Sequence, residues 1–107
     1  MAYQAKNFDS LLGTTGFSDQ LLQNHFTLYQ GYVTNTNKIT ETLWAMLRED
    51  KDGTPEYAEL KRRGGWEWNG MRLHELYFEN MSKESTKPNE NSALYDKLSG
   101  QYGTLAV

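Results

Sequence analysis

The first long segment with a helical pattern lies between Leu21 and Leu47. Apolar and aromatic residues recur there every three or four positions, which is the spacing of one face of an α-helix. Ser18 and Asp19, which favour the N-cap of a helix, come directly before this run. The pattern therefore predicts a helix that runs to about Arg48. The residues assigned to its apolar face are Leu21, Leu22, His25, Leu28, Tyr29, Tyr32, Ile39, Leu43 and Met46 or Leu47.

A second helical segment follows the loop EDKDGTPEY. Gly53 breaks the first pattern, Thr54 suits an N-cap, and Pro55 stands where the first helical residue is expected. Two long helices joined by a short loop form an antiparallel hairpin. Near the end of this segment Gly70 is small enough to let another backbone approach closely. The residues assigned to that face are Gly70, Met71, His74, Tyr77, Phe78 and Met81.

Two stretches are expected to interrupt the helices. Gly31 is followed by VTNTN, whose residues have poor helix propensity, so we expect a kink or an irregular turn in the first helix. Gly64 and Gly65 separate the polar PEYAELKRR from the aromatic WEWNGMRLHELYFENM. A break or kink is therefore expected at this glycine pair as well.

The remaining segments complete an all-α fold class. Residues 1–17 carry isolated apolar residues between glycines, which is typical of an extended, ordered arm without long regular structure. The stretch SKESTKPNENS is polar and contains a proline, as linkers do, and SALYDKLSGQYGTLAV predicts one short amphipathic helix. We therefore expect a helical-hairpin domain over 1–82, a linker over 83–92 and a short C-terminal helix within 93–107.

Composition excludes several classes of function. The chain has 107 residues, which is enough for one domain with a modest core. With 11 basic and 14 acidic residues and no basic run, nucleic acid is not an expected partner. Because there is no cysteine, disulfides, thiolate metal sites and cysteine nucleophiles are excluded. The sequence has neither a secretory signal pattern nor an apolar stretch long enough to cross a membrane, so a soluble cytoplasmic protein is expected.

The chain has two histidines, His25 and His74, one on each predicted helix. Both fall on the predicted buried face, and antiparallel helices could bring them opposite each other. Two imidazoles make half of a metal site, because zinc, iron or manganese needs further ligands. Core histidines that bond a hydroxyl or a carbonyl fit the same pattern, so both interpretations stay open. Glu75 and Glu79 do not make a metalloprotease motif with His74, since neighbouring helix positions point to different faces.

Two motifs resemble the N-terminal helical-hairpin domain of the iron/manganese superoxide dismutases. They are HFTLYQGYVTNTNK, which begins at His25, and WNGMRLHELYFENM, which contains His74. Their order, separation and intervening loop agree with that family, and YQAKNFDSLLG is similar to the arm before the hairpin in a bacterial branch of it. The resemblance implies the N-terminal part of an enzyme that converts superoxide to oxygen and hydrogen peroxide with an iron or manganese ion.

The resemblance also implies roles for five residues. His25 and His74 would be two of the four protein ligands of the metal. Tyr32 matches the catalytic tyrosine that guards the substrate funnel and takes part in proton delivery. Tyr29 and Gly70 would lie around the ligands, and Gly70 stands where many iron enzymes have glutamine and manganese-type members have glycine. The spacing from His25 to Tyr32 is one residue shorter than is common in the family, so its helix bulge is expected to be absent.

In that family the site is completed by an aspartate and a histidine of a C-terminal α/β domain, within an Asp-x-Trp-Glu-His motif. This chain lacks the motif, and ALYDKLSGQYGTLAV resembles only the first helix of that domain. We therefore expect a truncated protein that is inactive alone and is completed by a C-terminal segment or another chain.

Two alternatives to this interpretation remain, and whether the chain alone is an enzyme stays open. One is a non-catalytic hairpin that serves as an assembly or interaction module. The other is a self-associated site in which two copies pool His25 and His74. Apolar surface left uncovered on the hairpin would favour a homo-oligomer in either case.

Overall fold

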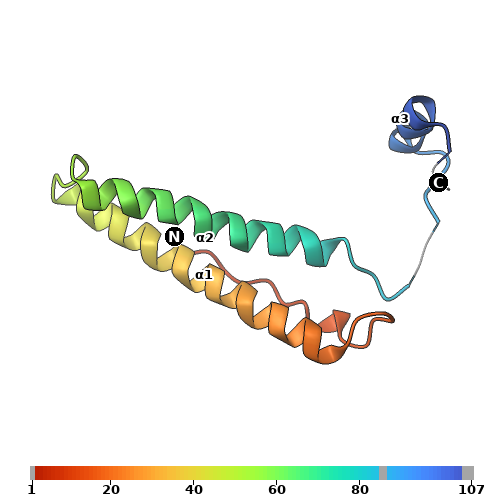
Figure 1. The fold of residues 1–107 in the computed structure, drawn as a ribbon, viewed down its shortest axis with the longest axis horizontal. Helices are drawn as coiled ribbons and strands as arrows, with labels where there is room; N and C mark the ends of the chain where they lie inside the picture. The colour runs from red at the N-terminus through yellow and green to blue at the C-terminus, as the bar shows by residue number, and fades with distance from the viewer. Residues whose placement is uncertain (1, 85–86, 105–107) are drawn as a thin grey trace.

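The computed structural model is all-helical and describes residues 2–84 and 87–104. Its elements are a short 3-10 helix, η1 (Asp9–Leu11), and the α-helices α1 (Asp19–Arg48), α2 (Pro55–Glu79) and α3 (Ala93–Tyr102). Figure 1 shows α1 and α2 as an antiparallel hairpin, the N-terminal arm beside it, and α3 away from it beyond the linker. The expected all-α class, with a long hairpin and a short C-terminal helix, is confirmed.

Both long helices begin where the sequence predicts, because a side chain caps each one. The Ser18 hydroxyl accepts a hydrogen bond from the Leu21 N–H at 3.1 Å, and the Thr54 hydroxyl accepts one from the Tyr57 N–H at 3.2 Å. Each bond satisfies a backbone donor that has no partner inside the helix. Pro55 is the first residue of α2, where its missing N–H costs no hydrogen bond. The predicted N-termini of both helices are thus confirmed.

The expected irregular turn at Gly31 and the expected break at Gly64 and Gly65 were wrong, while a kink at either place stays a prediction. α1 continues for 30 residues through Gly31, and α2 continues for 25 residues through Gly64 and Gly65. Each glycine costs a helix about 1 kcal/mol relative to alanine, but packing of the two helices against each other outweighs such local preferences. At Gly64 the small residue also has a packing role, because a Cβ there would lie 3.2 Å from Cγ2 of Ile39.

The core lies between α1, α2 and the N-terminal arm, and the predicted apolar face of α1 was partly wrong. Leu21, Leu28 and Leu47 are exposed, whereas Phe26 and Val33, which were not assigned to that face, are buried. Apolar residues occur on more than one side of α1, and the contact with α2 and the arm decides which side is buried. The buried apolar residues are Leu11, Leu22, Phe26, Tyr29, Val33, Met71 and Phe78, with Phe8, Leu12, Phe17, Tyr32 and Met81 packed against them.

The N-terminal arm is ordered by side chains of the hairpin rather than by regular structure of its own. The Asn37 amide accepts a hydrogen bond from the Tyr3 N–H at 2.6 Å and donates one to the Tyr3 carbonyl at 2.9 Å. Further along, the Phe8 ring packs against Phe78 with ring centroids 4.9 Å apart. The arm is therefore packed on the hairpin.

Beyond the hairpin, Ser92 caps α3 by accepting a hydrogen bond from the Tyr95 N–H at 3.1 Å. The division into 1–82, 83–92 and 93–107 stays a prediction. Within residues 2–84 and 87–104, no helix is both long and apolar enough to span a membrane.

Candidate metal centre

His25 on α1 and His74 on α2 lie next to each other across the hairpin. Their ring centroids are 5.9 Å apart and their ring planes are inclined by 45°. A metal ion lies about 2.1 Å from a ligating ring nitrogen, and the ring centroid lies roughly 1.1 Å beyond that nitrogen. Two imidazoles that bind one ion therefore have centroids at most about 6.4 Å apart. The observed separation satisfies this limit. The pairing of the two histidines across the hairpin is confirmed, and their role as ligands stays a prediction.

The hydrogen bonding of the two imidazoles suits metal binding. Nδ1 of His74 lies 2.6 Å from the carbonyl oxygen of Gly70, and because a carbonyl only accepts, Nδ1 must be the donor. In a neutral ring this leaves Nε2 unprotonated, which is the common state of a metal-bound histidine. Nδ1 of His25 is buried without a hydrogen-bond partner among the described residues. The bond to Gly70 therefore leaves Nε2 of the His74 ring for a metal ion, whereas Nδ1 of His25 is an unpaired but buried atom.

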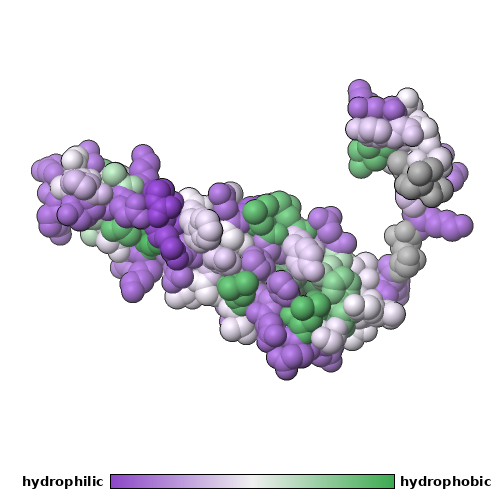
Figure 2. Space-filling model, viewed as in Figure 1, coloured by the Kyte–Doolittle hydropathy of each residue, from purple (hydrophilic) through white to green (hydrophobic). Residues whose placement is uncertain are grey.

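The histidine pair lies at an open, mainly apolar surface. Together with Leu73 and Tyr77, the two rings line a depression of about 190 Å³. Leu73 is 64% exposed and Tyr77 is 43% exposed. Figure 2 shows hydrophobic side chains reaching the surface on the part of the hairpin nearer the linker. Both histidines are only partly buried and lie at the edge of the core, so the predicted buried face is incompletely covered at this place.

Tyr32 lies beside His74 because Gly70 leaves room for its ring. The centroids of Tyr32 and His74 are 5.4 Å apart. A Cβ atom at position 70 would lie only 2.4 Å from Cε1 of Tyr32, which no real packing tolerates. The expected close approach at Gly70 is therefore found, although an aromatic ring and not a backbone makes it. Gly70 thus contacts both aromatic neighbours, since its carbonyl also accepts the His74 bond.

Replacing Gly70 by alanine is expected to lower the free energy of unfolding by about 1–3 kcal/mol, because the new methyl group overlaps the Tyr32 ring. Gly65→Ala is the matched control on the same helix, since a Cβ there has no atom within 4 Å. The control should be neutral or stabilise by up to about 1 kcal/mol. Thermal unfolding of both variants, followed by circular dichroism, measures the difference. Equal midpoints for the two variants would contradict the packing of Tyr32 on Gly70.

Tyr29, one helical turn after His25, makes its polar contacts with Glu75 and with the arm. Its hydroxyl donates to Oε2 of Glu75 at 2.7 Å and accepts from the backbone N–H of Lys6 at 2.9 Å. Burial, which the N–H of Lys6 partly offsets and the Glu75 carboxylate reinforces, raises the pKa of Tyr29 to about 12. The hydroxyl is therefore protonated at neutral pH and can donate to the carboxylate. The predicted place of Tyr29 around the metal ligands stays a prediction.

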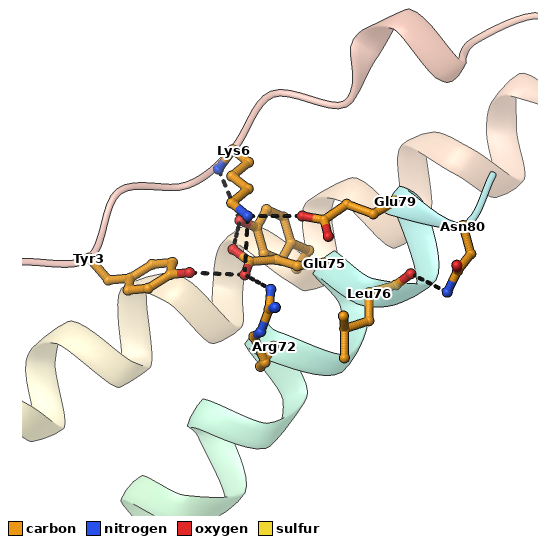
Figure 3. A network of polar contacts seen from close by, with 8 residues as sticks. Tyr3, Lys6, Arg72, Glu75, Leu76, Glu79 and Asn80 are labelled. Atoms are coloured by element: carbon orange, nitrogen blue, oxygen red, sulfur yellow. Dashed lines mark hydrogen bonds and ion pairs between the residues drawn. The ribbon is translucent and has the colours of Figure 1, made fainter. Parts of the chain in front are cut away.

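Glu75 is the residue near the histidines that sequence reasoning missed. Its side chain is completely buried, and Oε1 accepts hydrogen bonds from the Tyr3 hydroxyl at 2.9 Å and from Arg72 at 3.1 Å. Nζ of Lys6 lies 4.0 Å from the same oxygen. Burial alone would raise the pKa of Glu75, but the bonds from Tyr29, Tyr3 and Arg72 outweigh it and the pKa is lowered. Figure 3 shows Tyr3, Lys6 and Arg72 gathered around the carboxylate. Because its pKa is lowered, the carboxylate is charged at neutral pH.

The spacing of residues on α2 held a signal for Glu75. It stands four residues after Met71 and three before Phe78, both of which are buried, so a helical wheel places it on the core face. A charged residue at such a position needs partners, because an unpaired buried charge is costly. Arg72, three residues earlier on the same helix, is a partner that the local pattern offers. Tyr3, Lys6 and Tyr29 come from distant parts of the chain and could not be named from it.

Within residues 2–84 and 87–104, no group of three or more histidine, aspartate or glutamate side chains could hold a metal ion. The described part of the chain therefore offers two imidazoles at one place and no further ligand of these types beside them. Iron and manganese sites require more ligands than two.

Comparison with known proteins finds relatives that match most of this chain. It is 34% identical over 95 residues to the superoxide dismutase [Fe] of Aquifex aeolicus (strain VF5) and to that of Aquifex pyrophilus, covering 84% of this chain and 44% of each relative. The superoxide dismutase [Fe] of Saccharolobus solfataricus is 33% identical over 81 residues, or 72% of this chain and 37% of the relative. The chain thus spans less than half the length of these curated relatives. No family model and no solved structure matches it.

Proposed function

We propose that this chain belongs to the iron/manganese superoxide dismutase family, corresponds to its N-terminal domain, and supplies His25 and His74 as two ligands of a dismutase metal site. The observation that carries the proposal is the pair of imidazoles on facing helices, with centroids 5.9 Å apart. Iron is the metal we propose, because all three relatives are named as iron enzymes, and manganese is the alternative. Superoxide is the proposed substrate.

The other ligands are proposed to come from protein outside the described residues, either a C-terminal segment or another chain. Two neutral imidazoles bring no negative charge, so alone they hold a trivalent ion poorly. The depression at His25, Leu73, His74 and Tyr77 is open and apolar, as expected of a surface that a further protein segment covers. We therefore expect the isolated chain to be a very poor dismutase.

An iron ion held by the two histidines would supply the one-electron oxidation and reduction of superoxide. The carbonyl of Gly70 orients the His74 ring through the 2.6 Å bond to Nδ1. Tyr32, 5.4 Å from that ring, is proposed to restrict entry to the site and to take part in proton delivery. Once covered, the apolar side chains of Leu73 and Tyr77 would keep bulk water away from the ligands. The cytoplasmic location expected from the sequence stays a prediction.

The test is complementation with the C-terminal part of the Aquifex pyrophilus enzyme, the portion that this chain does not match. Mixed with that fragment and iron, the wild-type chain should take up metal and dismutate superoxide at least about a thousandfold faster than either part alone. His25→Ala and His74→Ala should each lose both the metal and the activity. Asn24→Ala, an exposed neighbour of His25 on the same helix, serves as the control.

The outcomes separate the alternatives. Unchanged metal content in both histidine variants would refute the proposed ligand role. Failure of the wild-type chain to take up metal, with or without the fragment, would favour the interaction module. One metal ion for every two chains, with dimers in light scattering and no need of the fragment, would favour the pooled histidine site.

A further inference from the structure

A hydrogen bond joins the two long helices directly beside the histidine pair. Tyr29 follows His25 by one turn of α1, and Glu75 is the residue after His74 on α2. The 2.7 Å bond from the Tyr29 hydroxyl to Oε2 of Glu75 therefore links the two turns that carry the imidazoles. Both side chains are fully buried, so water does not compete for this bond.

The N-terminal arm contacts both residues that form this bond. The Tyr3 hydroxyl donates to Oε1 of Glu75, and the backbone N–H of Lys6 donates to the hydroxyl of Tyr29. Nζ of Lys6 also donates to Glu79, one turn further along α2, at 2.8 Å, but both side chains are exposed, so this ion pair adds little to how the arm is held. Figure 3 shows Tyr3 and Lys6 reaching from the arm towards the glutamates of α2. The arm thus bonds to both partners of the interhelical link and not to one helix alone.

Aromatic packing connects the same arm to the histidines. The Phe8 ring lies 4.9 Å from Phe78, and Phe78 lies 6.0 Å from His74 and 5.1 Å from Phe26, the residue after His25. A shift of the arm would therefore move the ring that supports His74. The polar and the apolar contacts of the arm therefore both reach the part of the hairpin that carries His25 and His74.

We propose that Glu75 is a positioning residue for the histidine pair and that the N-terminal arm clamps it in place. The carboxylate determines how α1 sits against α2 at the level of His25 and His74, and so the distance between the two rings. Apolar packing alone would allow small sliding of the helices, whereas a buried carboxylate accepts its hydrogen bonds in one arrangement only. This inference rests on the proposed metal-binding role of the histidines.

Glu75→Gln tests this role directly. Glutamine keeps the size of the side chain but replaces one accepting oxygen by an NH₂ group, which can only donate. Tyr29, Tyr3 and Arg72 all donate to the carboxylate, so one of these bonds must be lost. Glu79→Gln is the matched control: it is the same change one turn away on α2, on an exposed glutamate bound by Lys6. Tyr3→Phe removes only the arm's bond to Glu75 and leaves a partly exposed ring, so it should fold even if Glu75→Gln does not.

The first measurement is the affinity of the full chain for cobalt(II), at a temperature where circular dichroism shows each variant fully helical. Glu75→Gln should bind cobalt about tenfold more weakly than wild type and Tyr3→Phe about threefold more weakly, while Glu79→Gln should bind as wild type does. If Glu75→Gln folds and binds cobalt as tightly as the wild type, the proposal is overturned. If Glu75→Gln does not fold, wild-type cobalt affinity in Tyr3→Phe overturns it. Equal weakening in Glu75→Gln and Glu79→Gln would overturn it too.

The second measurement needs no metal and separates this inference from the proposed function. The ring-proton chemical shifts of His25 and His74 report the nearby rings of Tyr77 and Tyr32, at 5.8 and 5.4 Å. They should change in metal-free Glu75→Gln and Tyr3→Phe and stay unchanged in Glu79→Gln. If the wild type binds no cobalt, the metal role fails while these shifts still decide whether Glu75 positions the rings. Unchanged shifts in the two test variants would refute the positioning role.

Discussion

Replacing Phe78 by alanine is expected to lower the free energy of unfolding by about 3–5 kcal/mol, a large part of the stability of a small domain. Phe78 is 1% exposed, and its ring packs against Phe8 of the arm and against Phe26 and Tyr29 of α1. Truncation therefore opens a cavity where all three parts of the hairpin domain meet. Urea unfolding followed by circular dichroism measures the loss as a shift of the midpoint.

Tyr77→Ala is the control for Phe78→Ala, because it truncates an aromatic residue of similar size at the next position of α2. Its ring is much more exposed, so the loss should stay below about 1 kcal/mol. The contrast depends on the arm being packed on the hairpin as described. A similar midpoint for both variants would contradict the position of the core between arm, α1 and α2.

Removing the hydroxyl of Tyr29 is expected to cost about 2–3 kcal/mol, although the change to phenylalanine deletes a single atom. The hydroxyl donates to a completely buried carboxylate oxygen of Glu75 and accepts from the N–H of Lys6. Tyr29→Phe leaves both groups without this partner in a place that water reaches poorly. A bond to a buried charged group contributes more than a neutral one, and losing it exposes the full desolvation penalty.

The matched control for Tyr29→Phe is the same substitution at Tyr102, near the end of α3. Its side chain is largely exposed, so its hydroxyl can bond water in the folded and unfolded states alike. The free energy of unfolding should then change by less than about 0.5 kcal/mol. Equal stability of the two variants in chemical denaturation would show that the Glu75 network does not stabilise the hairpin.

The helix starts and the hairpin could be predicted because their causes are local. A capping hydroxyl such as that of Ser18 or Thr54 accepts a hydrogen bond from a backbone N–H three residues away. Both partners therefore lie within four consecutive residues of the sequence. The facing of His25 and His74 also followed from local spacing, once two helices of similar length were joined by a short loop. These features need no knowledge of distant contacts.

The continuity of the helices and the identity of their buried faces could not be predicted in the same way. Gly31, Gly64 and Gly65 weaken a helix when taken alone, but the packing of α1 on α2 offsets that loss. On α1, Leu28 and Phe26 are equally apolar candidates for the core, and only the contact with α2 and the arm decides that Phe26 is buried. Such choices depend on surfaces that meet only in the folded chain.

What the sequence by itself determined is therefore the set of local structures and the placing of one histidine on each helix of a hairpin. Only the tertiary structure decided that the pair lies at an open apolar depression, that Tyr32 fills the space at Gly70, and that Glu75 is buried. The physical reason is the distance along the chain between interacting groups. Tyr3 and Tyr29 precede Glu75 by 72 and 46 residues, so no local pattern encodes their hydrogen bonds.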